Sequence, residues 1–581
     1  MKVTIAKTAG FCMGVRRAVE MALDAPEKYQ QPIYTYGPLI HNPQVLDLFD
    51  ERGVGILSAI PASGHGTVLI RAHGVPPDTK ERLESAGFQV IDATCPRVIQ
   101  VQTIIRVHAQ KGYATIIVGD KDHPEVIGLL GFAGDKGHVV ANLDELALLP
   151  AFEKAIIVAQ TTQNKDFFES VKQKAYIQYP HYKVFDTICG STEKRQSEVK
   201  ELADSVDAMV VVGGKNSGNT QRLVELAKAA GKPAIPVETD EDLELSALLD
   251  FKHIGIAAGA STPNWIIKRV YRTLENIPIR QQGGWKKQLH HIQKVLILTD
   301  IYLALGAGCL CYACTKLMGK NGFFPQGIIA MLYVLSMHIF NHITSTAEDR
   351  FNDSERARFY QIHKSKLIFL GLLAGAVGVL AAFSAGLLAF ILTASMIITG
   401  LSYNLHVLPL RRDGKQIYLR IRDIPGSKTI FIAVAWGVVT ALLSALAEIE
   451  TITIGTILVF LWSTGIVFAR TVFYDILDMQ EDRIVGKETL PILLGAKRSL
   501  KLLKGVLTAT FFILIFSALL GEITKLGYLL TLCPLFLFGV IEAHARGKIQ
   551  PGVRLEFQIE TVFTIAGFIA LVWSVLIRSG L

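Results

Sequence analysis

The chain has 581 residues, half of them hydrophobic and 19% charged, and its formal net charge is +8 at pH 7. This length exceeds what one hydrophobic core supports, so at least two domains are expected. The positive charge is modest and shows no interleaving of basic with aromatic residues, which argues against nucleic acid as a partner and favours a bias toward a membrane surface.

Seven cysteines, an odd number in a long chain, argue against a disulfide framework. The first residues, MKVTIAKTAGFCMGV, contain neither the apolar segment nor the cleavage site of a signal peptide. We therefore expect the N-terminal half to lie in a reducing cytoplasm, where free thiols and metal clusters are compatible with folding.

Residues 1–280 alternate between short apolar runs and polar segments of helical period. The runs, bounded by Gly and Pro, are VTIA, TVLIRAHG, ATIIVGD, AIIVAQTT, AMVVVGGKN and IGIAAGAS. Segments such as RVIQVQTIIRVHAQKG and TQRLVELAKAAGK separate them. This alternation predicts an α/β domain, or several small ones, with buried parallel strands whose carboxyl ends bind ligands.

Three cysteines stand at predicted strand-to-loop junctions. Cys12 follows VTIAKTAGF, Cys95 lies in IDATCP and Cys189 in FDTICGST. Their wide spacing excludes a local zinc ribbon or a CxxC redox motif. Taken singly, each could be a small buried residue. Three thiolates converging on one point would instead hold an iron–sulfur cluster and leave one iron open to a substrate.

A second set of residues suits an anion. It lies in Gly- or Pro-containing loops and comprises His41, His73, His123, Ser217, Asn219 and Ser261. The last three lie in two segments, GGKNSGNTQRL and AAGASTP, that run from a strand through a small-residue loop into a helix, where backbone N–H groups add to anion binding. A diphosphate fits better than a nucleotide because no GxxxxGK[ST] is present. Glu125, two residues after His123, is the natural proton donor, and Thr161 in AQTTQ is placed to position it.

Residues 1 to about 280 resemble the 4-hydroxy-3-methylbut-2-enyl diphosphate reductases, the IspH/LytB family. The resemblance rests on FCMGVRRAVE, PLIHNPQV, RAHGV, DATCP, HPEVIG, QTT, ICGSTEKRQ, VVGGKNSGNTQRL and AGAST, which occur in this order. It implies a trefoil of three α/β lobes around a [4Fe–4S] cluster held by Cys12, Cys95 and Cys189. It also implies reductive dehydroxylation of the allylic diphosphate to isopentenyl and dimethylallyl diphosphate, with two electrons from a ferredoxin or flavodoxin.

The same resemblance assigns roles within the anion set. It implies that this set binds the diphosphate, together with Thr161 and Gly218, and that Glu125 with Thr161 delivers protons. One position departs from the pattern, because Gly218 stands where many members carry a second serine. One side-chain hydroxyl is lost there, and a backbone amide is expected to compensate.

A Gly-, Gln- and Lys-containing linker, residues 281–294, separates this domain from a membrane domain expected over residues 295–581. About nine apolar stretches of near 20 residues follow the linker, at roughly 295–313, 323–343, 367–383, 385–402, 429–447, 452–469, 503–520, 525–542 and 560–578. Lys and Arg concentrate between spans two and three, four and five, and six and seven. By the positive-inside rule these loops face the cytoplasm, so the protein is expected in the inner membrane with its N-terminal domain on the cytoplasmic side.

One loop of the membrane half carries an array of carboxylates. Asp475, Asp478 and Asp482 stand at i, i+3 and i+7, so one helical face would hold all three. Mg²⁺ bridging these acids to a diphosphate is the expected use, and Arg483 and Lys487 could hold the departing diphosphate. A solvated acidic loop is the alternative.

Residues 290–581 resemble the UbiA prenyltransferase family. The segment RTVFYDILDMQEDRIVGKETLPILLG is similar to the family's second aspartate motif, and SYNLHVLPLRRDGK to its tyrosine-containing loop. In the first motif, FNHITSTAEDRFNDSE, Asn341 and Asp349 match, whereas His342 and Ser345 replace carboxylates; Asp353 lies one turn further. The resemblance implies Mg²⁺-dependent transfer from allylic or polyprenyl diphosphates in the lipid bilayer.

Two alternatives remain at this point. The membrane half could be a non-catalytic anchor, which the altered first motif favours. The N-terminal half could be a binding module without chemistry, which its complete set of cysteines and Glu125 disfavours. Cys309, Cys311 and Cys314 lie inside an apolar stretch and are interpreted as packing residues rather than as a metal motif.

Overall fold

The computed structural model describes residues 2–277, 285–320, 325–344, 354–402, 406–412, 415–420, 426–446, 452–485 and 489–578. The chain divides into two compact units, Met1–Pro278 and Ile279–Leu581. The first is built from strands and helices in alternation, and the second is almost entirely helical.

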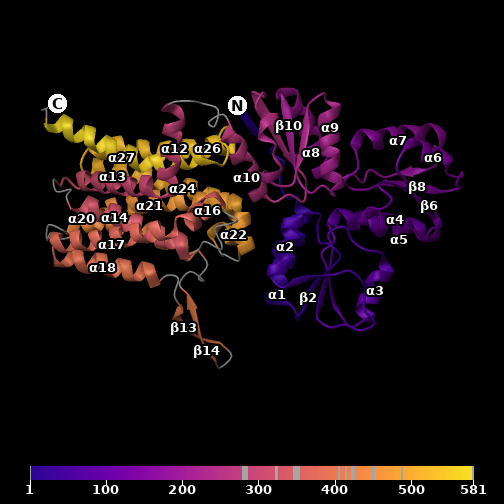
Figure 1. Ribbon diagram of the computed structural model, residues 1–581, viewed down its shortest axis with the longest axis horizontal. Coiled ribbons are helices and arrows are strands. Elements are labelled where there is room, and N and C mark those ends of the chain that lie inside the picture. The colour runs from indigo at the N-terminus through magenta and orange to yellow at the C-terminus, as the bar shows by residue number, and fades with distance from the viewer. Residues whose placement is uncertain are drawn as a thin grey trace. The chain divides into compact units, whose positions relative to one another are not determined.

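Three sheets of four parallel strands form the first unit, and each occupies its own lobe (Figure 1). The β10 sheet has the order β1 (Lys2–Ile5), β12 (His253–Ala258), β10 (Ala208–Val212), β11 (Ala234–Val237). The β2 sheet has the order β3 (Val54–Leu57), β2 (Ile33–Tyr36), β4 (Thr67–Ile70), β5 (Gln89–Asp92). The β6 sheet has the order β7 (Gly137–Val140), β6 (Ala114–Val118), β8 (Ala155–Ala159), β9 (Lys183–Val184).

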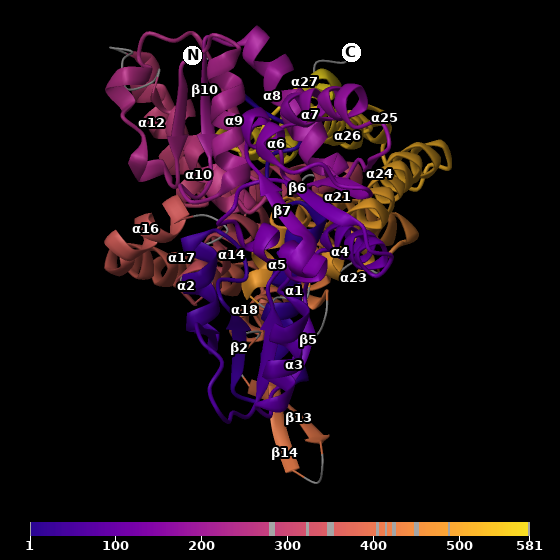
Figure 2. The ribbon, with the colours of Figure 1, turned by 90° about the vertical axis from the view of Figure 1, so that its right-hand side faces the viewer.

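Helices follow the strands and cover the sheets. They are α1 (Met13–Lys28), α2 (Pro43–Glu51), α3 (Pro77–Ser85), α4 (Pro96–Ala109), α5 (Pro124–Ala133), α6 (Leu143–Leu148), α7 (Lys165–Gln178), α8 (Gly190–Ser205), α9 (Gly218–Ala229) and α10 (Asn264–Glu275). Figure 2 shows α9 beside β10, as does Figure 1, and Leu223 packs with Val211 in one buried cluster. Every residue of β6, β8 and β10 is buried, as expected for parallel strands covered on both faces. The predicted α/β organisation is confirmed.

The second unit consists of helices and one hairpin. The helices are α12 (Trp285–Leu298), α13 (Ile301–Leu317), α14 (Gln326–Thr344), α16 (Ser354–Ile362), α17 (Lys364–Ala385), α18 (Leu387–Ser402), α19 (Ser427–Gly437), α20 (Leu443–Leu446), α21 (Ile454–Leu477), α22 (Met479–Val485), α23 (Leu490–Leu494), α24 (Ala496–Leu519), α25 (Leu526–Leu530), α26 (Leu532–Ala545) and α27 (Val553–Arg578). The antiparallel strands β13 (His406–Arg412) and β14 (Lys415–Arg420) form the hairpin.

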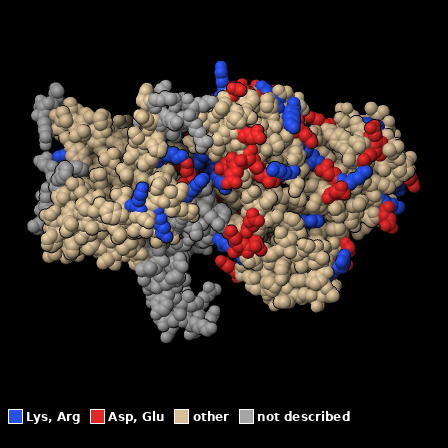
Figure 3. Space-filling view, viewed as in Figure 1, with Lys and Arg blue, Asp and Glu red and all other residues tan. Residues whose placement is uncertain are grey.

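Seven helical segments in the described residues are long and apolar enough to cross a membrane, or eight if the bent pair His291–Leu298 and Ile301–Leu317 counts as one span. Helix α18 is apolar but has only 16 residues. Each of the nine predicted stretches overlaps a helix, but the number of nine spans stays a prediction. On the face shown in Figure 3, Lys, Arg, Asp and Glu are dense over the first unit and sparse over the second.

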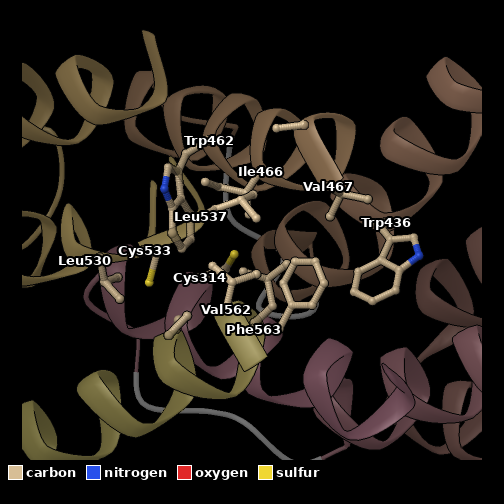
Figure 4. Packing of buried hydrophobic residues seen from close by; sticks show 14 of the residues in the cluster. Cys314, Trp436, Trp462, Ile466, Val467, Leu530, Cys533, Leu537, Val562 and Phe563 are labelled. Carbon is tan, nitrogen blue, oxygen red and sulfur yellow. The ribbon is translucent and has the colours of Figure 1, made fainter. Parts of the chain in front are cut away.

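The core of the second unit is a large apolar cluster in which Trp462 and Phe563 are fully buried. Figure 4 shows the Cys314 and Cys533 side chains among these residues. Cys311 and Cys314 have no exposed surface, which confirms that they are packing residues. Cys309 is partly buried, and a side chain at Gly567 would collide with it.

Candidate active sites

The three predicted cysteines occupy equivalent places in the three lobes. Cys12 follows β1, Cys95 follows β5 and Cys189 follows β9, and each is the N-cap of the next helix, α1, α4 or α8. All three line one cavity. Residues far apart in the sequence meet there because the carboxyl ends of the three sheets face the same space.

The backbone holds the three cysteines in the same way. Each cysteine N–H donates to a carbonyl in the loop after a neighbouring strand: Cys12 to Ala260 at 3.1 Å, Cys95 to Ala72 at 2.9 Å, and Cys189 to Thr161 at 2.9 Å. A helix N-terminus favours a thiolate, so the repeated N-cap position suits metal ligation.

The environment of Cys95 indicates that the thiols are close together. A side chain on Gly14 would overlap the Cys95 sulfur, so glycine makes room for it. Burial raises the pKa of the Cys95 thiol, first-turn N–H groups oppose this, and charges on Cys12 and Cys189 raise the pKa further. A cationic group bound by all three would relieve that repulsion. Three thiolates with no fourth cysteine among the described lining residues suit an iron–sulfur cluster with one open iron.

The three predicted histidines form a compact group in the same cavity. The ring centroids of His41 and His73 lie 4.7 Å apart, those of His41 and His123 5.7 Å, and those of His73 and His123 5.4 Å. His123 Nδ1 accepts from the Glu125 N–H at 3.1 Å, which leaves Nε2 as its donor. Within the described part of the chain, buried His41 Nε2 and His73 Nδ1 have no hydrogen-bond partner.

Electrostatics keep the histidines neutral in the absence of a ligand. Burial lowers the pKa of His41, and the neighbouring Arg71 lowers it further. Burial, with charge on His41 and His123, holds the pKa of His73 well below its usual value. Burial and charge on His41 lower the pKa of His123 to about 4. The trio has the geometry to hold a metal ion, but an anion that accepts from all three would satisfy the unpaired nitrogens as well.

Further donors come from the β10 sheet. Ser217 caps α9, and its Oγ accepts from the Thr220 N–H at 3.4 Å. Asn219 lies in the first turn, and its buried Nδ2 has no partner among the residues described. Ser261 Oγ donates to the His41 carbonyl at 3.2 Å. With the helix dipole of α9, this corner of the cavity suits phosphate oxygens.

Glu125 is buried beside the histidines, with 2% of its surface exposed. Its two oxygens accept from the Thr161 N–H at 2.6 Å and from Thr161 Oγ1 at 2.9 Å. Burial raises the pKa of the Glu125 carboxyl, while the bonds from Thr161 act in the opposite direction. Glu125 therefore holds a proton at higher pH than an exposed glutamate does, and Thr161 is its hydrogen-bond partner.

Two arginines near this cavity were not among the predicted site residues. Arg195, 4% exposed, donates to the Gly10 carbonyl at 2.6 Å and to the Ala258 carbonyl at 3.2 Å, and thereby ties α8 to the segment before Cys12. Arg222 of α9 pairs with Asp120 at 2.7 Å. Both lie inside motifs that carry the family resemblance, but the sequence alone does not show whether an arginine is buried or exposed.

The second unit contains a separate, mostly apolar cavity. Its lining includes Tyr333, Phe431 and Trp436, with Asn341, His338 and Lys428 as polar groups. Asn341, predicted as part of the first metal motif, thus lies at this cavity. Asp349 and Asp353, the other acids considered for that motif, lie outside the described residues, as do Ser345 and Lys487.

The second aspartate array spans the end of a helix. Asp475 lies in the last turn of α21, Asp478 caps that helix and Asp482 lies in α22, so the array crosses a helix junction instead of following one continuous helix. Asp475 and Asp482 are buried, and Asp475 accepts from Thr429 Oγ1 at 2.5 Å. Arg483 follows in α22. Their binding of Mg²⁺ stays a prediction.

A polar cluster that was not predicted lies near the start of α13. Asp300, in a left-handed conformation between α12 and α13, accepts from Arg356 Nη1 at 3.0 Å and from the Tyr360 hydroxyl at 3.2 Å. Arg356 Nη1 also donates to His342 Nε2 at 3.1 Å. His342, which replaces a carboxylate of the first motif, is thus engaged by an arginine.

Comparison with known proteins agrees with both halves. A family model described as LytB protein matches residues 3–275, and one described as the UbiA prenyltransferase family matches residues 302–556. The 4-hydroxy-3-methylbut-2-enyl diphosphate reductase of Aquifex aeolicus is 42% identical over 283 residues, which are 47% of this chain and 96% of that protein. The Geobacter sulfurreducens reductase is 40% identical, over 49% of this chain and 100% of its own. The chain is a fusion of a LytB-family domain with a UbiA-family domain.

Solved structures match the two domains separately. A structure of (E)-4-hydroxy-3-methyl-but-2-enyl diphosphate reductase is 42% identical, covers 48% of this chain and 100% of its own, and has a TM-score of 0.38. A UbiA homolog from Aeropyrum pernix K1 is 16% identical, covers 47% of this chain and 97% of its own, and has a TM-score of 0.37. Both predicted family resemblances are confirmed, and the chain is a multi-pass membrane protein.

Proposed function

We propose that the LytB-family domain reduces (E)-4-hydroxy-3-methylbut-2-enyl diphosphate to isopentenyl and dimethylallyl diphosphate. The observation that carries this proposal is that three thiols, three histidines, helix-terminal donors and a buried acid line one cavity. The reaction breaks a C–O bond and forms a C–H bond, consumes two electrons and two protons, and releases water. A ferredoxin or flavodoxin would supply the electrons.

Cys12, Cys95 and Cys189 would hold a [4Fe–4S] cluster, which when bound supplies electrons singly and an open iron for the substrate oxygen. The diphosphate would be bound by His41, His73 and His123 together with Ser217, Asn219 and Ser261, and by the backbone N–H of Gly218. The buried nitrogens of His41, His73 and Asn219 that have no partner in the described part of the chain support this assignment, since a buried donor without an acceptor is costly.

Glu125 would hold the proton that leaves with the hydroxyl group. Its burial favours the protonated form, and Thr161 lies within hydrogen-bond distance of both carboxyl oxygens. The test is anaerobic reduction of the substrate with dithionite and a mediator dye. Wild type should form both five-carbon products; a cluster-loaded protein that forms neither would refute this function.

For the UbiA-family domain we propose Mg²⁺-dependent transfer of an allylic or polyprenyl group to an acceptor in the bilayer. Asp475, Asp478 and Asp482, with Asn341 and Asp349, would bind Mg²⁺ and diphosphate, and Arg483 and Lys487 would hold the leaving diphosphate. The apolar cavity bordered by Asn341, His338 and Lys428 supports this, because it joins room for a prenyl chain to polar groups. Membranes given labelled polyprenyl diphosphates should form a Mg²⁺-dependent product.

We also propose, from the distribution of Lys and Arg, that the protein lies in the inner membrane with the reductase in the cytoplasm.

One observation favours a non-catalytic anchor as the second candidate for this domain. His342 stands where a carboxylate is expected, and its Nε2 accepts a hydrogen bond from Arg356. An anchor would keep the reductase at the membrane without prenyl transfer. The same labelled membranes separate the two candidates, since an anchor forms no product with or without Mg²⁺.

A further inference from the structure

Gly218 lines the reductase cavity without a side chain, and the space that its Cβ would fill is called the gap below. It is the first residue of α9, between Ser217 and Asn219, at the position where a second serine was expected from the family resemblance. A Cβ placed on Gly218 would lie 3.2 Å from Arg222 Nη1 and 3.8 Å from His123 Cδ2. The gap therefore lies beside both an arginine nitrogen and the imidazole ring of His123.

Arg222 is fixed behind this gap with one nitrogen unused. The residue is 7% exposed, its Nε donates to Gln163 Oε1 at 3.2 Å, and its Nη2 donates to Asp120 Oδ2 at 2.7 Å. In the part of the chain that the structure describes, its buried Nη1 has no acceptor. Leaving a buried cationic donor unpaired is costly, so the arrangement implies an acceptor that is not part of the protein.

Asp120 determines how Arg222 can act. Because Asp120 pairs with Arg222 and lies 3.6 Å from the same Cβ position, the two charges largely cancel at a distance. Arg222 is therefore expected to act through a short-range hydrogen bond donated by Nη1 and not through a long-range attraction for anions.

We propose that Arg222 donates from Nη1 to a diphosphate oxygen of the substrate across the gap at Gly218, and so replaces the hydrogen bond of the absent serine hydroxyl. This inference rests on the diphosphate site of the proposed reductase. It makes residues 218 and 222 an exchangeable pair: a serine side chain at 218 fills the gap and brings its own hydroxyl.

The experiment is a double-mutant cycle on the full-length, cluster-loaded protein. Wild type, Gly218→Ser, Arg222→Met and the double variant are titrated calorimetrically with inorganic pyrophosphate, with a chelator present to remove Mg²⁺. Lys228→Met, which removes an exposed cation from the same helix, is the matched control. Visible absorbance of the cluster and thermal unfolding show that each variant is folded, and Arg222→Lys provides a charged variant if Arg222→Met does not fold.

Arg222→Met should weaken pyrophosphate binding by about 10- to 100-fold when Gly218 is present, the range for a lost charged hydrogen bond. In the Gly218→Ser background the same change should cost only a few-fold, and Lys228→Met should cost nothing. Arg222→Lys should bind weakly as well, because it cannot make both fixing bonds and reach the gap. Equal losses in both backgrounds, or no loss in either, would overturn the inference. If wild type binds no pyrophosphate, the anion site of the proposed function fails too.

Discussion

The two units assemble polar groups in opposite ways. In the LytB-family domain, buried donors such as His41 Nε2 and Asn219 Nδ2 remain without partners among the described residues. In the UbiA-family domain, two buried acids already accept hydrogen bonds from the protein: Asp475 from Thr429, and Asp300 from Arg356 and Tyr360. Rigid strand ends can hold donors apart for a ligand, whereas these two acids of the helical unit are paired within the protein.

The most severe test of this comparison is to exchange a cysteine in each unit. Cys95→Ser should abolish the visible absorbance of the cluster and all reductase activity, because two thiolates and a hydroxyl make a poor cluster site. Cys309→Ser in α13 should leave both unchanged. Anaerobic absorbance and iron content measure the outcome. A Cys95→Ser protein with a full cluster would remove the proposed centre.

A smaller change separates proton delivery from cluster binding. Glu125→Gln keeps the shape of the side chain and one oxygen that can accept from the Thr161 N–H, but its amide cannot release a proton, so turnover should fall by about 10²- to 10⁴-fold. Cluster absorbance should be that of wild type. Substrate turnover with a dye donor is the measurement, and full activity in this variant would rule out Glu125 as the proton donor.

The membrane unit should respond independently of the reductase. Asp475→Asn should lower prenyl transfer by about 10- to 100-fold, because one acid of the proposed Mg²⁺ site is lost. Reductase activity of the same preparation serves as the internal control and should not change. Equal product from wild type and variant would support the anchor instead.

The engaged acids of the membrane unit should matter for stability. Arg356→Met would leave the buried Asp300 without its cation and should destabilise this unit by about 3 kcal/mol. Adding Asp300→Asn should recover part of the loss, since no charge then stays unpaired. Thermal unfolding in detergent measures both. If Arg356→Met unfolds at the wild-type temperature, Asp300 does not depend on this pair.

The smallest expected effect is the uptake of protons by the three histidines when an anion binds. Burial lowers the pKa of His41, His73 and His123, so all three are neutral at pH 7 before an anion binds. Pyrophosphate favours their charged forms, so binding should take up about one proton and strengthen as pH falls. Calorimetry in buffers of different ionisation enthalpy measures the uptake; proton release on binding would contradict the assignment.

The stability of the fold should depend on pH in the opposite direction, and fall as the pH falls. Because the pKa of His123 falls to about 4 in the fold, its contribution is complete above pH 6.5 and is lost as pH falls toward 4.

Much of the reductase site follows from the sequence because its ligands come directly after strands. Cys12, Cys95 and Cys189 stand at junctions that apolar runs and Gly or Pro mark, and parallel sheets bring such junctions to one edge. Histidines in the neighbouring loops follow the same rule. That the second unit contains long apolar helices was predictable from hydropathy alone, since a bilayer requires such helices.

Only the folded chain reveals which side chains are paired and which remain free. The sequence contains Arg222 and Arg356 as two similar letters. Arg222 has a nitrogen near Gly218 that finds no acceptor among the described residues, whereas Arg356 is bound to Asp300 and His342. Likewise, the aspartates from 475 to 482 have helical spacing, yet α21 ends among them. Periodicity in a sequence depends on local backbone geometry, whereas pairing depends on distances between residues that are remote in the chain, and tertiary packing alone sets those distances.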